Sequence, residues 1–273
     1  MAAQTTINLS HDLVPLGIAD QNMTPDTPAL DSQPLFLAAL NYIQNNPVEL
    51  LTADPGAYYF VSTFPSNSAV YLYFPPLANL TIDFQGSTLY FHDGYRRGFD
   101  IELCQNLRIE NFTIDYLAPA YTQVQLTSIN ANAGSFTYTP LAGWADPNTF
   151  VTTPEFGDPR LLGVFFRNGV QVAATGLTFF NYPISGKTLT VSSSDIAPWT
   201  QSNVFATLQA GDVLVVVNAN GADPIDVSKC DSLLFTNIEI HGGLGAINLF
   251  NTSNTTLDHI RVVPRPGALL GSG

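Results

Sequence analysis

One segment of the sequence recurs, and this recurrence constrains the fold more than any other feature. Residues 225–241 match residues 99–115 at an offset of 126 positions (225 minus 99). Apolar, polar and cysteine positions agree between the two copies, including Cys104 with Cys230. A third copy begins 22 residues later (247 minus 225), with apolar residues at the same places. Self-similarity at a fixed spacing of about 20–50 residues is typical of stacked repeat proteins.

Within each copy, apolar and polar residues alternate over short segments, such as Leu107-Arg-Ile109 and Phe112-Thr-Ile114. Alternation with period 2 predicts strands with one buried face. A 22-residue repeat is too short for an ordinary helix and strand together, so we expect three short strands per coil. The inward Ile, Leu, Val and Phe residues would stack into ladders that one coil alone could not bury. The sequence therefore predicts an all-β chain, folded as a parallel β-helix.

A second structure is expected between the first two copies, because the offset of 126 exceeds one 22-residue repeat by 104 residues. This stretch lacks the coil pattern but has strand signals of its own, separated by turn residues such as Asn168-Gly169. The expected strands are residues 122–129, 135–139, 161–167, 177–180, 188–191 and 213–217. Many short strands at this spacing predict a small β-barrel or sandwich inserted into the solenoid.

A helix is predicted near the N-terminus. Asp31 and Ser32 can cap it, Pro34 fits its first turn, and one apolar stripe follows. The stripe is formed by Leu35, Phe36, Ala39, Leu40 and Ile43. This helix would close the end of the solenoid. We therefore expect three parts: residues 1–115 with the cap helix and first coils, 116–218 as the inserted barrel-like subdomain, and 219–273 as further coils.

Charge and composition limit the partners that such a chain can bind. The formal net charge is -13, and lysine occurs only at Lys187 and Lys229. Such a surface repels nucleic acid and anionic membranes, so an oligosaccharide or neutral polysaccharide is the easier partner. No apolar run is long enough to span a bilayer. The start of the sequence shows no signal peptide, and its composition favours a mature secreted or periplasmic protein over a cytosolic one.

Several short motifs resemble a known family. At Asn111-Phe-Thr-Ile-Asp-Tyr116 and Pro119-Ala-Tyr-Thr-Gln123 the chain resembles carbohydrate-active, right-handed parallel β-helix proteins with the pectin-lyase-like fold. The likeness is greatest to the glycoside hydrolase family of α-1,3-galactosidases, which act on blood-group B and related glycans. Residues 211–213 and the segment Val263-Pro-Arg-Pro-Gly267 also resemble that family. The resemblance implies a right-handed β-helix interrupted by a β-barrel, and a glycan substrate.

The sequence departs from this family at its C-terminal end. Family members continue beyond the Arg-Pro-Gly segment into coils that carry an Asp-rich motif and a nearby His. This chain stops at residue 273. We therefore expect an N-terminal portion of an enzyme, in which the family's catalytic carboxylates could lie beyond the end of the chain.

Three aspartates are the candidate catalytic residues. Asp100 and Asp226 occupy equivalent positions in neighbouring coils, about 4.8 Å apart, and Asp115 is equivalent to His241. Glycoside hydrolysis commonly needs two carboxyl groups about 5–9.5 Å apart, so stacked carboxylates suit it. The alternative is structural: Asp and Asn side chains bind backbone amides at turns in any β-rich chain. For Asp115 and His241 the alternative is a pair of solvated turn residues.

Five residues are candidates for substrate binding. Tyr116, Tyr121 and Gln123 stand where the insertion begins, and an aromatic face beside an amide is common in sugar sites. Ordinary core tyrosines are the competing interpretation. His241 could orient a sugar hydroxyl, and Arg265 lies in the segment that resembles the galactosidase family.

No cofactor or metal is expected, because the sequence has no Cys/His cluster, phosphate-binding loop or Ser-His-Asp elbow. The two cysteines could form a disulfide between neighbouring coils or a ladder of buried thiols, and we favour the thiols. The leading functional prediction is a glycoside hydrolase, similar to an exo-α-galactosidase, that acts on neutral galactosides or on plant or host glycans. The alternatives are a non-catalytic glycan-binding or adhesive β-helix protein and, third, a polysaccharide lyase.

Overall fold

The computed structural model describes residues 5–66, 69–150, 161–172, 178–180, 184–191, 205, 207–218, 221–242, 245–263 and 265. Two compact units make up the chain, the first mainly Met1–Ala118 with Ala222–Arg265, and the second mainly Pro119–Gly221. Strands account for most of the described elements. The prediction of an all-β chain is therefore confirmed.

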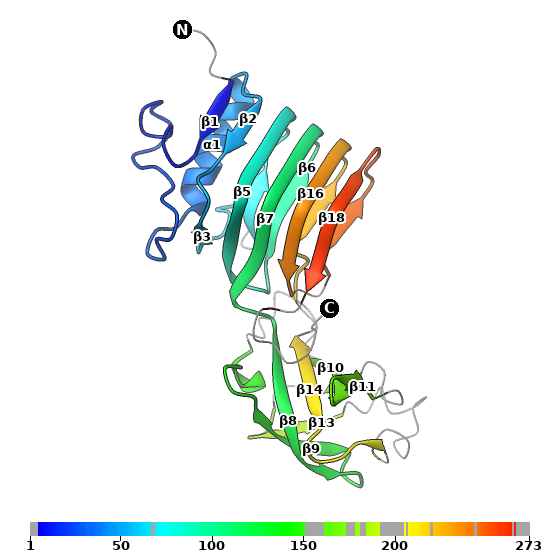
Figure 1. Ribbon diagram of the computed structural model, residues 1–273. Coiled ribbons are helices and arrows are strands. Elements are labelled where there is room, and N and C mark those ends of the chain that lie inside the picture. Colours follow the sequence, from blue (N-terminus) through cyan, green and yellow to red (C-terminus); the bar gives the residue numbers. More distant parts are fainter. Residues whose placement is uncertain are drawn as a thin grey trace. The chain divides into compact units, whose positions relative to one another are not determined.

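Two parallel sheets form the first unit. The larger has the order β1-β2-β5-β7-β16-β18, with β3 paired to β5, and Figure 1 shows its long strands side by side. Its strands are β1 (Thr6–Asn8), β2 (Leu50–Thr52), β3 (Ala57–Phe60), β5 (Ala78–Asp93), β7 (Gln105–Ala118), β16 (Asp231–His241) and β18 (Thr256–Val263). The smaller sheet has the order β17-β15-β6-β4. It contains β4 (Val70–Phe74), β6 (Arg97–Glu102), β15 (Ile225–Ser228) and β17 (Ile247–Phe250).

Residues that the sequence offsets align are direct neighbours in these sheets. Ile225 pairs with Phe99 on one side and with Ile247 on the other. In the larger sheet, Ile238 of β16 pairs with Phe112 of β7. The offsets of 126 and 22 residues therefore correspond to steps from one hydrogen-bonded strand to the next.

Alternate residues of these strands point into a shared apolar core. Phe99 and Ile101 of β6 are fully buried, as are Ile109 and Ile114 of β7. Burying a side chain of this size contributes roughly 1.5–3 kcal/mol. Because each inward residue stacks on its counterpart in the next strand, the core extends continuously across both sheets.

Helix α1 (Gln33–Asn45) lies at the β1–β2 end of the first unit (Figure 1). Its buried side chains include the whole predicted stripe: Leu35, Phe36, Ala39, Leu40 and Ile43. Phe36 stacks on Phe84 of β5 with ring centroids 5.8 Å apart. Ser32 is the N-cap residue but makes no side-chain cap bond; instead Asp31 Oδ1 accepts a hydrogen bond from the Gln33 amide (3.1 Å).

Left-handed residues recur in columns across the first unit, at and within its strands. Three columns of non-glycine residues have positive φ and repeat at the two sequence offsets. They are Leu103, Lys229 and Asn251; Asn106, Ser232 and Asn254; and Asn111, Asn237 and His259. Positive φ is uncommon outside glycine, and asparagine tolerates it best among the others. The left-handed residues therefore mark backbone bends, the first column between strands and the third within β7, β16 and β18.

Both cysteines are free thiols buried in the core. The Cys104 amide donates a hydrogen bond to Cys230 Sγ (3.2 Å), so the two residues are stacked as neighbours. Burial raises the pKa of the Cys104 thiol to about 12. The structure thus has the thiol ladder and no disulfide between these residues.

An antiparallel sheet of seven strands forms the second unit, with the order β11-β10-β14-β8-β9-β13 and β12 paired to β10. The strands are β8 (Tyr121–Asn130), β9 (Ser135–Pro140), β10 (Leu161–Arg167), β11 (Val170–Gln171), β12 (Thr178–Phe180), β13 (Thr188–Thr190) and β14 (Val213–Asn218). An isolated bridge pairs Phe180, the last residue of β12, with Val191, which directly follows β13. The path of pairings therefore returns to β10, as it does in a barrel. Of the strand residues expected here, Leu177 lies outside the described part of the chain.

Gly94 lies where the chain leaves and re-enters the first unit. Its amide donates to the Ala118 carbonyl (2.9 Å), and its carbonyl accepts from the Ala222 amide (3.1 Å). One residue therefore holds both ends of the long segment between them. Among the described residues, no helix is both long enough and apolar enough to cross a membrane.

The left-handed columns lead to a stability prediction at Asn106, whose φ is 51°. Its side-chain Nδ2 donates a hydrogen bond to Asn79 Oδ1 (2.9 Å). The Asn106→Gly variant loses this bond but accepts the backbone conformation, whereas Asn106→Val loses the bond and is strained. We expect the Val variant to be less stable than the Gly variant by about 1–2 kcal/mol in urea denaturation. Equal stabilities would contradict a left-handed bend at this position.

The buried thiols lead to a second prediction. Neither Cys104 nor Cys230 should react with Ellman's reagent at pH 8 in the folded protein, because both are buried and burial raises the pKa of each thiol. In urea both should react, giving two thiols per chain. Two unreactive cysteines in urea without reductant would mean that they are bonded.

Candidate active site

A row of polar and aromatic side chains lies on the outer face of the larger parallel sheet. Its members alternate with core residues: Tyr90 stands between Leu89 and Phe91, and Asp115 follows Ile114. Tyr90 of β5 is the register partner of Asp115 of β7. On β16, His241 follows Ile240, which pairs with Ile114. Period-2 alternation and parallel register together therefore bring a tyrosine, a carboxylate and an imidazole into one row.

His241 lies between two carboxylates. Its Nε2 is 2.7 Å from Glu239 Oε1, and its Nδ1 is 3.4 Å from Asp115 Oδ2. Asp115 and His241 are 5% and 7% exposed, whereas the Glu239 side chain is 30% exposed. Each ring nitrogen thus faces an acceptor oxygen, and only the glutamate is open to solvent. The imidazole is hydrogen-bonded to the accessible carboxyl group through Nε2, while Nδ1 lies near the buried carboxyl group without a hydrogen bond.

Asp115 is held from two further directions. Its Oδ1 accepts a hydrogen bond from the Tyr116 amide (2.7 Å), and its Oδ2 is 3.4 Å from Arg265 Nε. One oxygen is therefore fixed by the backbone, and the other faces His241 and Arg265. Such fixed orientation is what a preorganised catalytic or binding carboxylate requires.

A pair of stacked tyrosines adjoins this carboxylate. Tyr59 of β3 pairs with Tyr90 of β5, and the rings lie 5.3 Å apart between centroids at an interplanar angle of 13°. Burial raises the pKa of Tyr90, and the nearby Asp115 and Tyr59 raise it further, while Arg265 lowers it. The phenol is therefore a neutral donor beside Asp115 at physiological pH.

Glu239 also lines an open groove of about 420 Å³. Glu239 Oε2 lies 2.8 Å from Arg261 Nη1, and both side chains line the groove. The glutamate therefore belongs to the His241 cluster through one oxygen and to the groove through the other.

Asp100 and Asp226 are brought together elsewhere, on the smaller parallel sheet. They are register partners on β6 and β15, and Arg97 lies beside both, with Nε 2.9 Å from Asp226 Oδ2 and Nη1 3.5 Å from Asp100 Oδ2. Asn248 of β17 donates to Asp226 Oδ1 (3.2 Å). Burial raises the pKa of Asp100; Arg97 lowers it, and Asp226 and Glu102 raise it. Together these residues form an ion-paired ladder across three strands.

The three binding candidates at the start of the insertion are buried. Tyr116 is 1% exposed and its ring packs against Phe91 at 6.2 Å, inside the core of the first unit. Tyr121 and Gln123 belong to β8 of the second unit and are 3% and 0% exposed. In this structure all three side chains are packed in interiors, in contrast to His241 and Arg265, which reach Asp115.

Sequence reasoning missed Glu239, Tyr90 and Tyr59. The signal for Glu239 was present, since it stands two residues before His241 and therefore shares its face of the strand. Its equivalent in the first copy is Thr113, and comparison of the copies consequently hid it. The tyrosines lie on strands before the first clear copy of the repeat.

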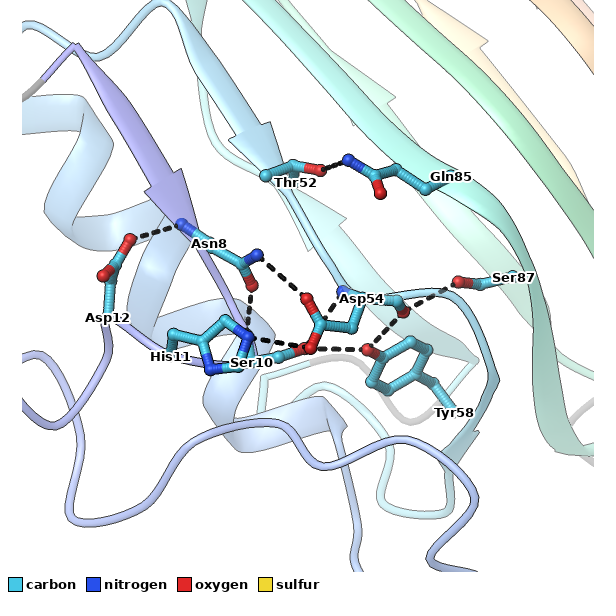
Figure 2. Close-up of polar contacts among 9 residues, drawn as sticks. All are labelled: Asn8, Ser10, His11, Asp12, Thr52, Asp54, Tyr58, Gln85 and Ser87. Atoms are coloured by element: carbon cyan, nitrogen blue, oxygen red, sulfur yellow. Dashed lines mark hydrogen bonds and ion pairs between the residues drawn. The ribbon is translucent and has the colours of Figure 1, made fainter.

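A Ser, a His and an Asp also meet near the N-terminus, as Figure 2 shows. His11 Nε2 lies 2.8 Å from Asp54 Oδ2. Ser10 Oγ, however, is hydrogen-bonded to Tyr58 Oη (2.9 Å) and accepts from the Asp54 amide (3.1 Å). Because the Ser10 hydroxyl is hydrogen-bonded to these groups and not to the imidazole, the three residues form a structural contact and not a nucleophilic triad.

Paired carboxyl groups serve in glycoside hydrolysis, and aromatic side chains line many ligand sites. No protein-family model matches the chain. Over 87 residues the chain is 34% identical to the protein named Alpha-1,3-galactosidase A of Bacteroides thetaiotaomicron. The match covers 32% of this chain and 13% of that protein. It supports a relationship to a glycoside hydrolase over that part of the chain.

The Asp100 ladder leads to a prediction about pH. Because the pKa of Asp100 is raised in the folded state, its ionised form opposes folding, and stability is lost as the pH rises through the folded pKa. Asp100→Asn removes this charge. We expect the variant to melt at or above the wild-type temperature at pH 7, with a difference that vanishes below pH 4. If the variant instead melts below the wild type at pH 7, and this deficit disappears at pH 4, the Arg97 contact contributes more than the burial of the Asp100 charge costs.

Proposed function

We propose that the protein is a glycoside hydrolase in which Asp115 and Glu239 are the catalytic carboxyl groups and His241 links them. The observation that carries this proposal is the placement of His241, with a carboxylate oxygen beside each ring nitrogen. The partial match to a galactosidase supports the reaction class.

The two carboxyl groups differ in ways that suit different roles. Asp115 is buried and held by the Tyr116 amide and Arg265, so we assign it to stabilise the positive charge that develops at the anomeric carbon. Glu239 is accessible and hydrogen-bonded to His241, so we assign it to proton transfer with the glycosidic oxygen or with water. The Tyr90 hydroxyl and Arg265 would orient sugar hydroxyls beside Asp115.

The proposed substrate is a neutral glycan that contains galactose. A chain with a formal net charge of -13 would repel acidic polysaccharides, and the Tyr59–Tyr90 pair offers an aromatic surface to a sugar ring. The relative's name specifies α-1,3-galactosidase activity, and we extend this to α-linked galactosides as the first substrates to test.

We further propose that the first unit is a right-handed parallel β-helix closed by α1, with the region 116–218 inserted between its parts 1–115 and 219–273. Parallel pairing throughout both sheets supports this, as does the agreement of register with the sequence offsets. A secreted or periplasmic location fits a protein that acts on external glycans.

Two alternatives rest on specific observations. Asp100 and Asp226 are a second carboxylate pair, and the raised pKa of Asp100 is a property of general acids. A glycan-binding protein without catalysis is the other alternative, because both carboxylates of the proposed site are paired with arginines, Asp115 with Arg265 and Glu239 with Arg261.

Hydrolysis of para-nitrophenyl α-galactoside tests the proposal. We expect Asp115→Asn and Glu239→Gln each to reduce kcat/KM by about 100-fold or more, in the range lost with an acid-base group. Glu110→Gln is the matched control, because Glu110 is also paired with an arginine, Arg108, on the same sheet but outside the cluster. It should retain activity within about twofold, the effect expected of an exposed ion pair.

The outcome distinguishes the alternatives. Loss of activity in Asp226→Asn, with Asp115→Asn still active, would move the catalytic site to the Arg97 ladder. A folded wild-type chain that binds galactosides without hydrolysing any would support the glycan-binding alternative.

A further inference from the structure

We infer that the groove beside Glu239 is a second saccharide subsite, which holds the sugars of a neutral oligosaccharide beyond the one bound at Asp115. This inference deepens the proposed function and rests on it for the substrate class. On this inference the protein binds several linked sugars of an oligosaccharide and not the terminal sugar alone.

The groove follows one of the left-handed columns across the larger sheet. It runs over the bend at Gln85 and Gly86 of β5 and over the column formed by Asn111, Asn237 and His259. These positions belong to four successive strands, β5, β7, β16 and β18. Three steps of about 4.8 Å between strands give a length of about 14 Å, which exceeds a single sugar ring.

The side chains along the groove suit uncharged hydroxyl groups. Amides line it at Asn111 and Asn237, a hydroxyl at Thr113, an imidazole at His259, and the Glu239–Arg261 pair neutralises its own charge. Such a lining offers donors and acceptors in turn, with no excess charge to attract an ion. A neutral saccharide is therefore the occupant whose chemistry matches.

The amides of the groove are preorganised. Asn111 Nδ2 donates to Asp83 Oδ1 (2.9 Å), and Asn237 Nδ2 donates to Asn111 Oδ1 (3.0 Å). The backbone of each asparagine is left-handed, with φ of 61° and 58°. Because these side chains are already ordered, a ligand would lose little conformational entropy by binding to them.

Glu239 makes the groove continuous with the proposed catalytic cluster. One of its oxygens faces His241 and the other faces Arg261 in the groove wall. A saccharide that passes Glu239 would therefore have one sugar at Asp115 and the next in the groove. Longer substrates should gain affinity from the groove, and a single galactose should not.

Calorimetric titration with two probes tests the inference. The probes are methyl α-galactoside and the trisaccharide galactosyl-α-1,3-galactosyl-β-1,4-glucose. We expect wild type to bind the trisaccharide more tightly. Asn237→Gly and His259→Gly remove a groove side chain while glycine accepts the left-handed backbone at both positions. Each should weaken trisaccharide binding about fivefold or more and change methyl α-galactoside binding less than twofold, as expected for loss of one or two hydrogen bonds.

Ser232→Gly and Asn254→Gly are the matched controls, because both residues are left-handed but belong to the neighbouring column, outside the groove; Ser232 lies on β16 and Asn254 just before β18. They should bind both probes like wild type.

The inference fails if wild type binds the trisaccharide no better than the monosaccharide, or if the groove variants bind the trisaccharide as tightly as wild type does. If trisaccharide binding depends on Asn237 while no galactoside is hydrolysed, the subsite stands and the hydrolase proposal fails. If hydrolysis depends on Asp115 but Asn237→Gly leaves trisaccharide affinity unchanged, the hydrolase proposal stands and the subsite inference fails.

Discussion

Parallel hydrogen bonding between strands that lie 22 or 126 residues apart is the interaction on which the first unit depends. No single pass of the chain can bury its own apolar face, because each contributes only a few inward residues such as Phe99 and Ile101. Burial becomes possible only when Ile225 pairs with Phe99 and Ile247 pairs with Ile225. Backbone register and core packing are therefore one constraint, since a slip of one residue would turn every apolar side chain outward.

The same constraint aligns the outward side chains. Whatever stands at one outward position lies beside its counterpart on the next strand, so a tyrosine, a carboxylate and an imidazole form a row without any local motif. Asp115 and His241 meet across 126 residues of sequence in this way. The groove lies over the column of left-handed residues Asn111, Asn237 and His259, and hydrogen bonds order the two asparagine side chains.

Sequence alone predicted the register, the inward ladders, the first helix and most strands of the second unit, because alternation and self-similarity are properties of the chain itself. It predicted that Asp100 meets Asp226, but it could not predict which side chains at non-equivalent positions meet. Arg97 lies beside both Asp100 and Asp226, and Glu239 binds His241, through rotamers that no periodicity encodes. Tyr116 was expected at a sugar site but is buried, since alternation continues through Asp115 and turns the next residue inward. Tyr121 is covered by contacts within the second unit, which only its own folding creates.

Gly94 holds the two ends of the segment between Ala118 and Ala222 close together. Because Ala118 and Ala222 both bond to this one residue, the long segment between them is a detour that returns to its point of departure. The first unit therefore carries the insertion without changing its own register, and closing a flexible detour costs only about 0.6 kcal/mol for each doubling of length. A change in the length of the segment between 118 and 222 would therefore leave the strand register of the first unit unaltered.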